Sequence, residues 1–185
     1  MVRWEPGTRE RLQQAALALF TERGFDGTTV ADIAEAAGTT ERTFFRYFSD
    51  KREVLFHGQE EFERVFLDSV AGADASPAAL LASVLDRAAE LFPEERRPWS
   101  RARQAVVVSH PALQERELLK MARLAAALTT GLTERGLDPT IASLTAESIV
   151  SVFRTSFAQW VAEDETRSFA ELVGTTRDQL QHLTA

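Results

Sequence analysis

The 185-residue sequence contains no cysteine. This absence excludes disulfide bonds, thiolate nucleophiles and cysteine-ligated metal sites. The sequence also lacks any run of about 18 or more apolar residues, so we expect no membrane-spanning helix and no membrane partner. Residues 1–6 do not form the apolar stretch of a secretory signal peptide. These absences lead us to expect a soluble, cytoplasmic protein.

Groups that could carry out catalysis are also scarce. The three histidines lie far apart in the sequence and do not show the spacing of metal ligands. The acidic segment 60–63 lacks the Glu-x-x-His motif of di-iron helical bundles. Gly-x-Ser-x-Gly hydrolase motifs and glycine-rich phosphate loops are absent as well. We therefore expect neither an enzyme nor a protein that needs a cofactor or a metal ion.

Acidic residues predominate, but they are unevenly distributed. The formal net charge is −7, which at first argues against a nucleic-acid partner. Residues 1–58, however, hold eight basic and nine acidic residues, so most of the negative charge lies beyond them. Within residues 39–52, four basic residues are accompanied by only two acidic ones. A local basic patch of this kind can bind DNA, because affinity depends on local phosphate contacts.

Apolar residues recur with helical spacing along almost the whole chain, which predicts an all-α fold. In the first predicted helix, Leu12, Ala15, Ala16, Leu19 and Phe20 share one face. We expect Thr8 to cap this helix and Gly24 to end it. No segment shows the alternation of a β-strand.

Two short helices are predicted next, followed by a long one. The segment 29–32 fits the capping-box pattern and starts a helix that Gly38 ends. The next helix covers residues 40–48. Two short helices joined by a tight, glycine-containing turn are typical of a helix-turn-helix. Ser49 and Asp50 are expected to cap a connecting helix from Lys51 to about Val70.

Five further helices are predicted, at residues 77–92, 98–108, 112–135, 139–162 and 168–183, separated by proline and glycine residues. The predicted organisation is a homeodomain-like three-helix domain over residues 1–54 and a larger helical domain over residues 55–185.

The helix over residues 40–48 is the most informative about function. Phe44 and Phe48 share one face, which must be buried, so Thr40, Thr43, Arg46 and Tyr47 point outward. Arginine can read guanine edges, threonine can contact a thymine methyl group and tyrosine can bond a phosphate. An ordinary amphipathic helix with a solvated face explains this pattern equally well. A helical domain that binds another protein, or an enzyme built as a helical bundle, is a further alternative.

A family resemblance favours the DNA-binding interpretation. The block Gly27-Thr-Thr-Val-Ala-Asp-Ile-Ala-Glu-Ala-Ala-Gly38, followed by Thr43-Phe-Phe-Arg-Tyr-Phe48 and Asp50-Lys51, resembles the DNA-binding domain of the TetR family of repressors. The resemblance covers residues 8–57 and is only architectural beyond them. It implies a homodimeric regulator that binds double-stranded DNA at a palindromic operator and is released by a small effector.

The resemblance also implies roles for single residues. Phosphate contacts are expected from Thr28, Thr29, Phe45, Tyr47 and Lys51, and base contacts from Thr40, Arg42, Thr43 and Arg46. Phe45 departs from the family pattern, because many members have tyrosine there. Without the hydroxyl group Phe45 cannot bond a phosphate, so we expect it to pack or to contact a sugar.

In this family the last two long helices form the dimer, so we expect the interface to include Ile149, Val150, Phe157, Phe169, Leu172, Val173 and Leu180. Packing within one subunit explains the same stripes. The other helices are expected to enclose a pocket lined by Trp99, Arg103, Val107, Leu118, Met121, Phe153 and Trp160. The expected effector is small and apolar, and a weak similarity to actinobacterial regulators suggests an acyl-CoA. Effector binding is expected to displace the connecting helix and change the separation of the two DNA-binding heads.

Overall fold

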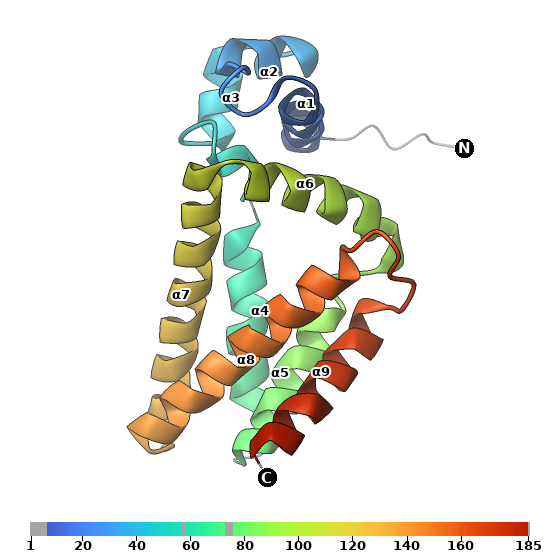
Figure 1. Ribbon diagram of the computed structural model, residues 1–185. Helices are drawn as coiled ribbons and strands as arrows, with labels where there is room; N and C mark the ends of the chain where they lie inside the picture. Colours follow the sequence, from blue (N-terminus) through green and yellow to red (C-terminus); the bar gives the residue numbers. More distant parts are fainter. Residues whose placement is uncertain (1–6, 57, 73–75, 185) are drawn as a thin grey trace, which may run out of the picture. The chain divides into compact units, whose positions relative to one another are not determined.

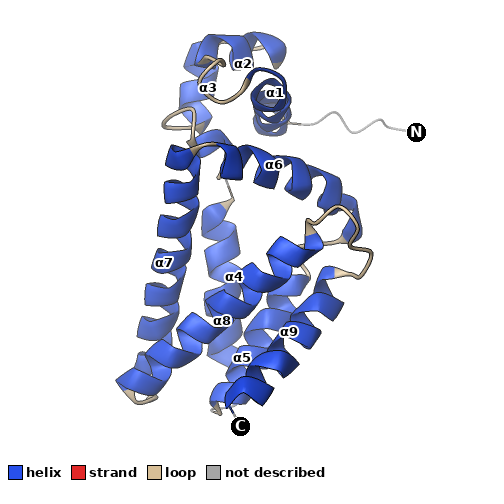
Figure 2. Cartoon of the chain, viewed as in Figure 1, coloured by secondary structure: helices blue, strands red, loops and turns tan. Residues whose placement is uncertain are grey.

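The computed structural model of the protein describes residues 7–56, 58–72 and 76–184. These residues are helical or lie in turns and loops, and no strand occurs among them (Figure 2). The all-α prediction is therefore confirmed. The chain divides into two compact units. The first combines residues 1–58 with residues 102–114, and the second combines residues 59–101 with residues 115–185.

The first unit contains three short α-helices and a 3₁₀ turn (Figure 1). They are α1 (Thr8–Arg23), α2 (Val30–Ala36), α3 (Glu41–Tyr47) and η1 (Glu53–Leu55). The later part of α6 (Arg97–Ser109) and the start of α7 (Pro111–Glu134) belong to the same unit. Helix α2 packs against both α1 and α3, and η1 packs against α1. This is the three-helix arrangement that the glycine-containing turn predicted.

Local sequence signals account for the helix ends in this unit. Helix α1 ends before Gly24, whose positive φ of 77° suits a residue without a side chain. The α1 prediction was wrong at its start, because Gly7 is the N-cap and Thr8 is already helical. At α2 the predicted capping box is present. The Asp32 N–H donates to Thr29 Oγ1 at 3.1 Å, and the Thr29 N–H donates to Asp32 Oδ2 at 2.7 Å.

The core of the first unit is built from the apolar stripes of its helices. Its fully buried aromatic residues include Phe44, Phe48 and Phe56. Further buried side chains come from α1, α2, η1, α6 and α7: Leu12, Ala16, Leu19, Phe20, Ile33, Ala34, Val54, Leu55, Val106, Val107 and Leu113. Burial of these side chains stabilises the unit through removal of apolar surface from water.

The predicted connecting helix from Lys51 to Val70 is not continuous. The 3₁₀ turn η1 ends at Leu55, and α4 (Gln59–Gly72) begins only after Gly58. Gly58 has a φ of 92°, which no residue of a right-handed helix adopts. The apolar spacing of residues 54–70 concealed this break, because a 3₁₀ turn and an α-helix bury similarly spaced residues.

The second unit holds α4, α5 (Pro77–Ala89), η2 (Glu94–Arg96), the first turn of α6, most of α7, α8 (Pro139–Trp160) and α9 (Phe169–Thr184). Helix α5 packs against α4, α8 and α9, and α8 packs against α9. Figure 1 shows α8 and α9 side by side, with α5 next to α9. The buried core of this unit draws on α4, α5, α7, α8 and α9.

Aromatic rings gather at one end of this core. Phe153, Phe157, Trp160 and Phe169 contact one another with centroids 5.6–6.5 Å apart. Phe92, which follows α5, contacts all four rings. Such pairs add stability beyond the area that they bury.

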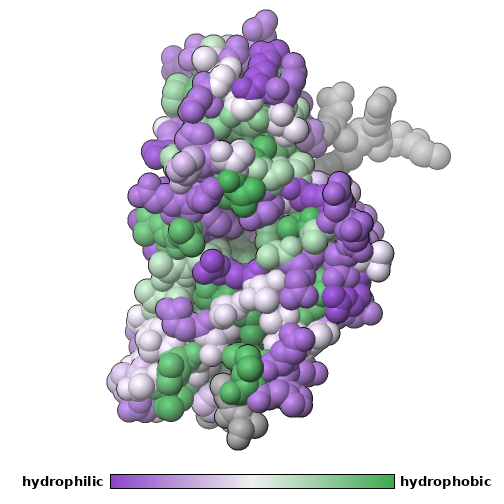
Figure 3. All heavy atoms as spheres, viewed as in Figure 1, coloured by the Kyte–Doolittle hydropathy of each residue, from purple (hydrophilic) through white to green (hydrophobic). Residues whose placement is uncertain are grey.

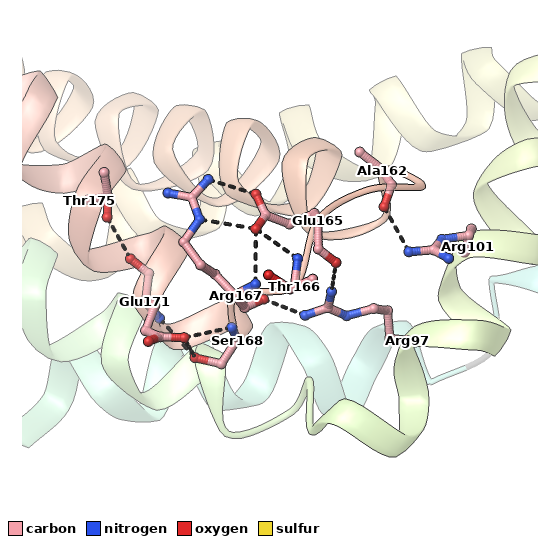
Figure 4. Close-up of polar contacts among 9 residues, drawn as sticks. All are labelled: Arg97, Arg101, Ala162, Glu165, Thr166, Arg167, Ser168, Glu171 and Thr175. Carbon is pink, nitrogen blue, oxygen red and sulfur yellow. Dashed lines mark hydrogen bonds and ion pairs between the residues drawn. The ribbon is translucent and has the colours of Figure 1, made fainter.

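Two arginines in the first turns of α6 bind the loop between α8 and α9 (Figure 4). The buried Arg97 donates to the carbonyl oxygens of Glu165 and Arg167, and its guanidinium carbon lies 5.3 Å from the centre of the Trp160 ring. Arg101 donates to the carbonyl oxygens of Val161 at 2.9 Å and Ala162 at 2.7 Å. These contacts fix the loop backbone, because a charged donor makes strong hydrogen bonds.

The same loop carries a carboxylate that organises its own backbone. Glu165 Oε1 accepts from the N–H groups of Thr166 at 3.0 Å and Arg167 at 2.9 Å, and Oε2 accepts from Arg167 Nη2 at 2.6 Å (Figure 4). The hydrogen bonds from the Arg167 side chain, followed by those from the backbone, lower the pKa of Glu165 to about 2. Glu165 is therefore ionised throughout the neutral range.

The observed units differ from the predicted division at residues 54 and 55. The first unit extends to Gly58 and also recruits residues 102–114. Side-chain contacts account for this recruitment. Arg103 Nε donates to the Leu55 carbonyl oxygen at 2.8 Å, and its guanidinium carbon lies 4.8 Å from the centre of the Phe56 ring. The His110 ring lies 4.7 Å from the Phe25 ring, and Nε2 lies 3.2 Å from both carboxylate oxygens of Asp26.

Candidate nucleic-acid interface

Helix α3 is set at a defined angle to α2 by the turn that joins them. Gly38 has a φ of 63°, the left-handed conformation that ends a helix, and the Thr39 N–H donates to the Ala34 carbonyl oxygen at 2.9 Å. Thr40 then caps α3, because its Oγ1 accepts from the Thr43 N–H at 3.2 Å. Gly38, the backbone hydrogen bond of Thr39 and the Thr40 cap thus fix the helix-turn-helix that the sequence predicted.

One face of α3 is anchored in the core. Phe44 and Phe48 are almost fully buried, and their ring centroids are 5.3 Å apart. This spacing of four residues places both rings on one side of the helix. The opposite side is open to solvent, as the pattern of residues 40–48 predicted.

The open side of α3 carries the predicted base-reading residues. Thr40, Arg42, Phe45 and Arg46 are exposed, and Thr43 is half-buried. Arg42 has neither a hydrogen bond nor an ion pair to the described part of the chain. The visible surface over α2 and α3 is mainly hydrophilic (Figure 3). An exposed arginine with no internal partner can form bidentate hydrogen bonds with a guanine edge.

Tyr47 lies between two guanidinium groups. The guanidinium carbon of Arg46 is 4.9 Å from the ring centre, and that of Arg9, on α1, is 5.3 Å away. Arg46 Nη2 also donates to the Tyr47 hydroxyl oxygen at 3.2 Å. This Arg9–Tyr47–Arg46 stack joins α1 to the exposed face of α3 and concentrates positive charge there. Sequence reasoning missed Arg9, since no local pattern relates it to a residue 38 positions later.

Two of the residues that the family resemblance assigned to phosphate contacts are occupied inside the unit. The fully buried Thr28 donates from Oγ1 to the carbonyl oxygens of Leu19 and Gly24. Lys51 Nζ donates to the carbonyl oxygens of Phe25 at 2.6 Å and Thr28 at 2.8 Å. These groups hold the turn between α1 and α2, and they use the hydroxyl proton of Thr28 and two of the three ammonium protons of Lys51.

Lys51 also packs against an aromatic ring. Its ammonium nitrogen lies 4.1 Å from the centre of the Phe25 ring, which adds a cation–π contact to the two carbonyl bonds. The expected phosphate contact of Lys51 therefore has no support from its position, which is that of a structural cation.

Thr29 remains at the surface, at the start of α2. Its hydroxyl and N–H both bond the Asp32 carboxylate, and these bonds, the side-chain one first, hold the pKa of Asp32 below its ordinary value. Asp32 is thus ionised at neutral pH and occupies part of the N-terminal end of α2. The only hydroxyl proton of Thr29 is donated to Asp32, so a phosphate contact from this side chain would require that hydrogen bond to break.

The seven residues expected to line an effector pocket are divided between the two units. Phe153 and Trp160 lie in the aromatic cluster of the second unit, and Met121 is buried in the core of the same unit. Arg103 and Val107 belong to the first unit. Trp99 is half-buried, and Leu118 on α7 is 55% exposed. An exposure this high does not suit the wall of an enclosed pocket.

The seven residues expected at a dimer interface lie inside one subunit. Ile149, Val150, Phe169, Leu172 and Val173 are buried in the core of the second unit, and Phe157 and Leu180 pack against it. The stripes on α8 and α9 are thus intrachain core, the alternative that periodicity alone left open. The exposed faces of these helices, together with the half-buried Phe157 and Leu180, are the parts open to an interface.

No group of acidic or histidine side chains arranged to hold a metal ion occurs among the described residues. Within the same residues, no helix has the length and apolarity needed to cross a bilayer.

Family models match almost the whole chain. Residues 12–57 match the model described as bacterial regulatory proteins, tetR family, and residues 75–184 match the MftR C-terminal domain. The chain is 27% identical over 181 residues to MftR of Mycobacterium tuberculosis, named as a mycofactocin biosynthesis transcriptional regulator. That match covers 92% of this chain and 88% of MftR.

Other relatives match mainly in the helix-turn-helix region. TcmR of Streptomyces glaucescens, an HTH-type transcriptional regulator, is 43% identical over 60 residues, which are 32% of this chain and 26% of TcmR. The HTH-type transcriptional repressor KstR2 of Rhodococcus jostii is 38% identical over 85 residues, 46% of this chain and 38% of KstR2. The chain thus matches well under half of the length of these two relatives.

Solved structures share the fold along the chain. A TetR-family regulator from Syntrophomonas wolfei has a TM-score of 0.68 at 19% identity and covers 95% of this chain and 94% of its own. FadR from Bacillus subtilis, solved in complex with stearoyl-CoA, has a TM-score of 0.57 at 21% identity, with 92% and 96% coverage. With two family models, an exposed recognition helix and this shared fold in agreement, the chain belongs to the TetR family of DNA-binding transcriptional regulators, which are not enzymes.

Proposed function

We propose that this regulator is a cytoplasmic repressor that binds a palindromic operator as a homodimer and leaves it when a small, largely apolar effector binds. The observation that carries the proposal is the exposed face of α3, with Arg42 beside the Arg9–Tyr47–Arg46 stack. A recognition helix of a helix-turn-helix enters the major groove with such a face toward the bases.

The geometry favours a division of roles within this face. Arg42 and Arg46 have the donors to read guanine, and Thr40 and Thr43 have hydroxyl and methyl groups that can meet base edges. Tyr47 and Arg9 are placed to contact phosphates. Thr28, Thr29 and Lys51 are left out of this assignment, because their donors are bonded inside the unit.

The exposed side of α9 supports a homodimer. A Cβ atom added at the half-buried Gly174 would meet no neighbouring atom within 4 Å, so packing inside the subunit does not require glycine there. Ala170 on α9, and Ser151, Thr155 and Ala158 on α8, are small and exposed. Small residues allow a second pair of helices to approach closely. Two heads spaced about 34–36 Å apart would then read the two halves of a palindrome.

The comparisons motivate the proposals of repression and of an effector. KstR2 is named as a repressor, and the FadR structure from Bacillus subtilis was solved with stearoyl-CoA. The aromatic cluster and the apolar core of the second unit suit an apolar ligand more than a charged one. An acyl-CoA, whose chain is apolar, is therefore the first effector class to test.

Helix α6 offers a route by which an effector could act on the DNA-binding unit. Its residues Arg97 and Arg101 bind the α8–α9 loop, and Arg103, two residues later, bonds Leu55 in the first unit. Because the helix is continuous, a displacement of its first turns would change the contacts of its later turns. To weaken DNA binding 100-fold, the effector must favour the released state by about 2.7 kcal/mol.

Fluorescence anisotropy with the upstream intergenic DNA of the regulator's own gene, at two salt concentrations, tests the proposal. We expect sequence-specific binding that weakens as salt rises. Arg46→Ala should lower the affinity at least about five-fold, the smallest loss expected for a bidentate guanine contact. Arg87→Ala is the matched control, because this exposed arginine on α5 forms an ion pair with the nearby Glu90, outside the DNA-binding unit. Equal losses in both variants would contradict a specific role for α3.

The same assay then tests the effector. Addition of stearoyl-CoA to the bound complex should release the DNA if acyl-CoA is the effector class. Release by coenzyme A alone would indicate competition by the charged moiety rather than binding of the acyl chain.

A further inference from the structure

Phe45 is an anomaly on the face of α3. It is 54% exposed, and it is the only exposed large apolar side chain among the described residues of α1, α2, α3 and η1. An aromatic ring that is exposed to water does not contribute the stabilisation that its burial would provide. Its position, in the middle of a helix that otherwise presents polar and charged residues, indicates a partner outside the unit.

The ring is held in place despite its exposure. Its centroid lies 5.5 Å from that of Phe44, at an interplanar angle of 83°, so it rests edge-on against a fully buried ring. Edge-to-face pairs are a favourable arrangement of aromatic rings. Phe45 is thus presented outward on a fixed support, which lowers the entropy lost when it binds.

The chemistry of the ring selects what it can contact on DNA. Phenylalanine has no hydrogen-bond donor, so it can bond neither a phosphate nor the polar edge of a base. In the major groove the apolar feature of a base is the C5-methyl group of thymine. Arg42 lies three residues before Phe45, so the two side chains are neighbours on the helix surface.

From these observations we infer that Phe45 is a specificity-determining residue that reads the methyl group of one thymine in each half of the operator. This inference rests on the proposed function, because it requires α3 in the major groove. Side chains three residues apart are about 5–6 Å from each other, and successive base pairs are about 3.4 Å apart. The thymine therefore lies within about two base pairs of the guanine that Arg42 reads.

The test replaces single methyl groups on the DNA. The full-length protein first selects its preferred sequence from a pool of random duplexes. Each thymine of that sequence is then replaced by deoxyuridine, which removes only the methyl group. We expect one replacement in each half-site to lower the affinity of the wild-type protein about four-fold, the value of one buried methyl group. The other replacements should have little effect.

The variant Phe45→Ala completes the comparison. It should bind the thymine duplex more weakly and should no longer distinguish thymine from deoxyuridine at the sensitive position. Phe45→Leu, which keeps an apolar side chain, should retain part of the discrimination. Thr43→Ser removes one of the two threonine methyl groups on this face and should leave the discrimination at that position intact. Circular dichroism checks that each variant is folded.

The outcomes separate this inference from the proposed function. If the wild-type protein selects no sequence, the proposed function fails, and this inference fails with it. If it selects a sequence but no deoxyuridine replacement matters, only the role of Phe45 is overturned. Discrimination that persists in Phe45→Ala, or that disappears in Thr43→Ser, would assign the methyl contact to another residue.

Discussion

At the scale of single residues, Tyr47 makes two kinds of contact, and different substitutions remove each of them. Its ring supports Arg9 and Arg46, and its hydroxyl oxygen accepts a hydrogen bond from Arg46 at 3.2 Å. The ring contact depends only on the aromatic face, whereas the hydrogen bond requires the phenol. Substitutions at this position can therefore show how much the ring and the hydroxyl group of Tyr47 each contribute to DNA binding through Arg46.

We expect Tyr47→Phe to weaken operator binding by about two- to ten-fold, because it removes one hydrogen bond and one phosphate donor. Tyr47→Ala should weaken binding further, since both guanidinium groups lose the ring on which they stack. Anisotropy titrations of the two variants measure the difference. Equal affinities for Tyr47→Phe and the wild type would show that only the ring matters.

Arg97 is the buried charge on which the α8–α9 loop depends. Arg97→Met removes the donors to the carbonyl oxygens of Glu165 and Arg167 and the cation above Trp160. We expect this change to lower the free energy of unfolding by about 2 kcal/mol, since two backbone carbonyl groups lose a buried, charged donor. Urea unfolding measures the effect. The control Arg87→Met removes an exposed ion pair and should cost less than about 1 kcal/mol.

At the scale of elements, the junction between η1 and α4 depends on Gly58. The backbone there has a φ of 92°, which is strained for any residue with a side chain, although an added Cβ would meet no atom within 4 Å. The expected effect of a substitution at Gly58 therefore comes from the backbone and not from a steric clash.

Gly58→Ala should destabilise the protein by about 1 kcal/mol, because alanine resists a positive φ. If residues 51–70 formed one continuous helix, the same substitution would stabilise the protein by about 1 kcal/mol instead. The sign of the change in thermal or urea unfolding thus distinguishes a broken segment from a continuous one.

The α8–α9 loop gives a prediction about pH. The pKa of Glu165 is about 2 in the folded protein, below its ordinary value of 4.5. A lowered pKa stabilises the folded state above the unfolded value, and this contribution disappears as the pH falls from about 4.5 toward 2. We expect wild type to be more stable than Glu165→Gln at pH 6, with a difference that shrinks by pH 3. A difference that stays constant between these pH values would contradict the assigned hydrogen bonds.

Sequence patterns predicted the elements whose causes are local. The capping box of Thr29 and Asp32 and the glycine turn at Gly38 are fixed by residues a few positions apart, and both were found. The break at Gly58 was missed, because the apolar spacing on either side of it is compatible with one helix. The structural role of Lys51 was also missed, since it depends on carbonyl groups more than 20 residues away.

The site could be predicted only in part for the same reason. Thr40, Thr43, Arg46 and Tyr47 were placed on the open face by their spacing from the buried Phe44. In the structure Thr40 and Arg46 are exposed, and Thr43 and Tyr47 are half-buried. For α8 and α9, the apolar stripes were real, but periodicity does not say whether a stripe faces its own chain or a second one. The structure places those stripes in the core.

At the scale of the whole molecule, the proposed homodimer makes Gly174 a sensitive position. Gly174→Leu should not destabilise the isolated subunit, because an added Cβ meets no neighbouring atom within 4 Å and leucine favours helices. It should block close approach of a second subunit and weaken dimerisation at least about ten-fold. Sedimentation velocity measures the dimer fraction.

Ala126→Leu, at an exposed position on α7, is the matched control and should leave the dimer unchanged. An intact dimer in Gly174→Leu would place the interface elsewhere. A wild-type protein that stays monomeric at all concentrations would contradict the homodimer.

The composition of the first unit limits how this regulator can be recombined with others. Residues 102–114 belong to it, and Arg103 and His110 bond residues of the N-terminal segment. A chimera joined at residue 58 would combine the N-terminal segment of another regulator with residues 102–114 of this protein. In this protein those residues contact Leu55, Phe56 and Asp26. We therefore expect a graft that carries both pieces of sequence to keep these contacts, and a graft of residues 1–58 alone to lose them.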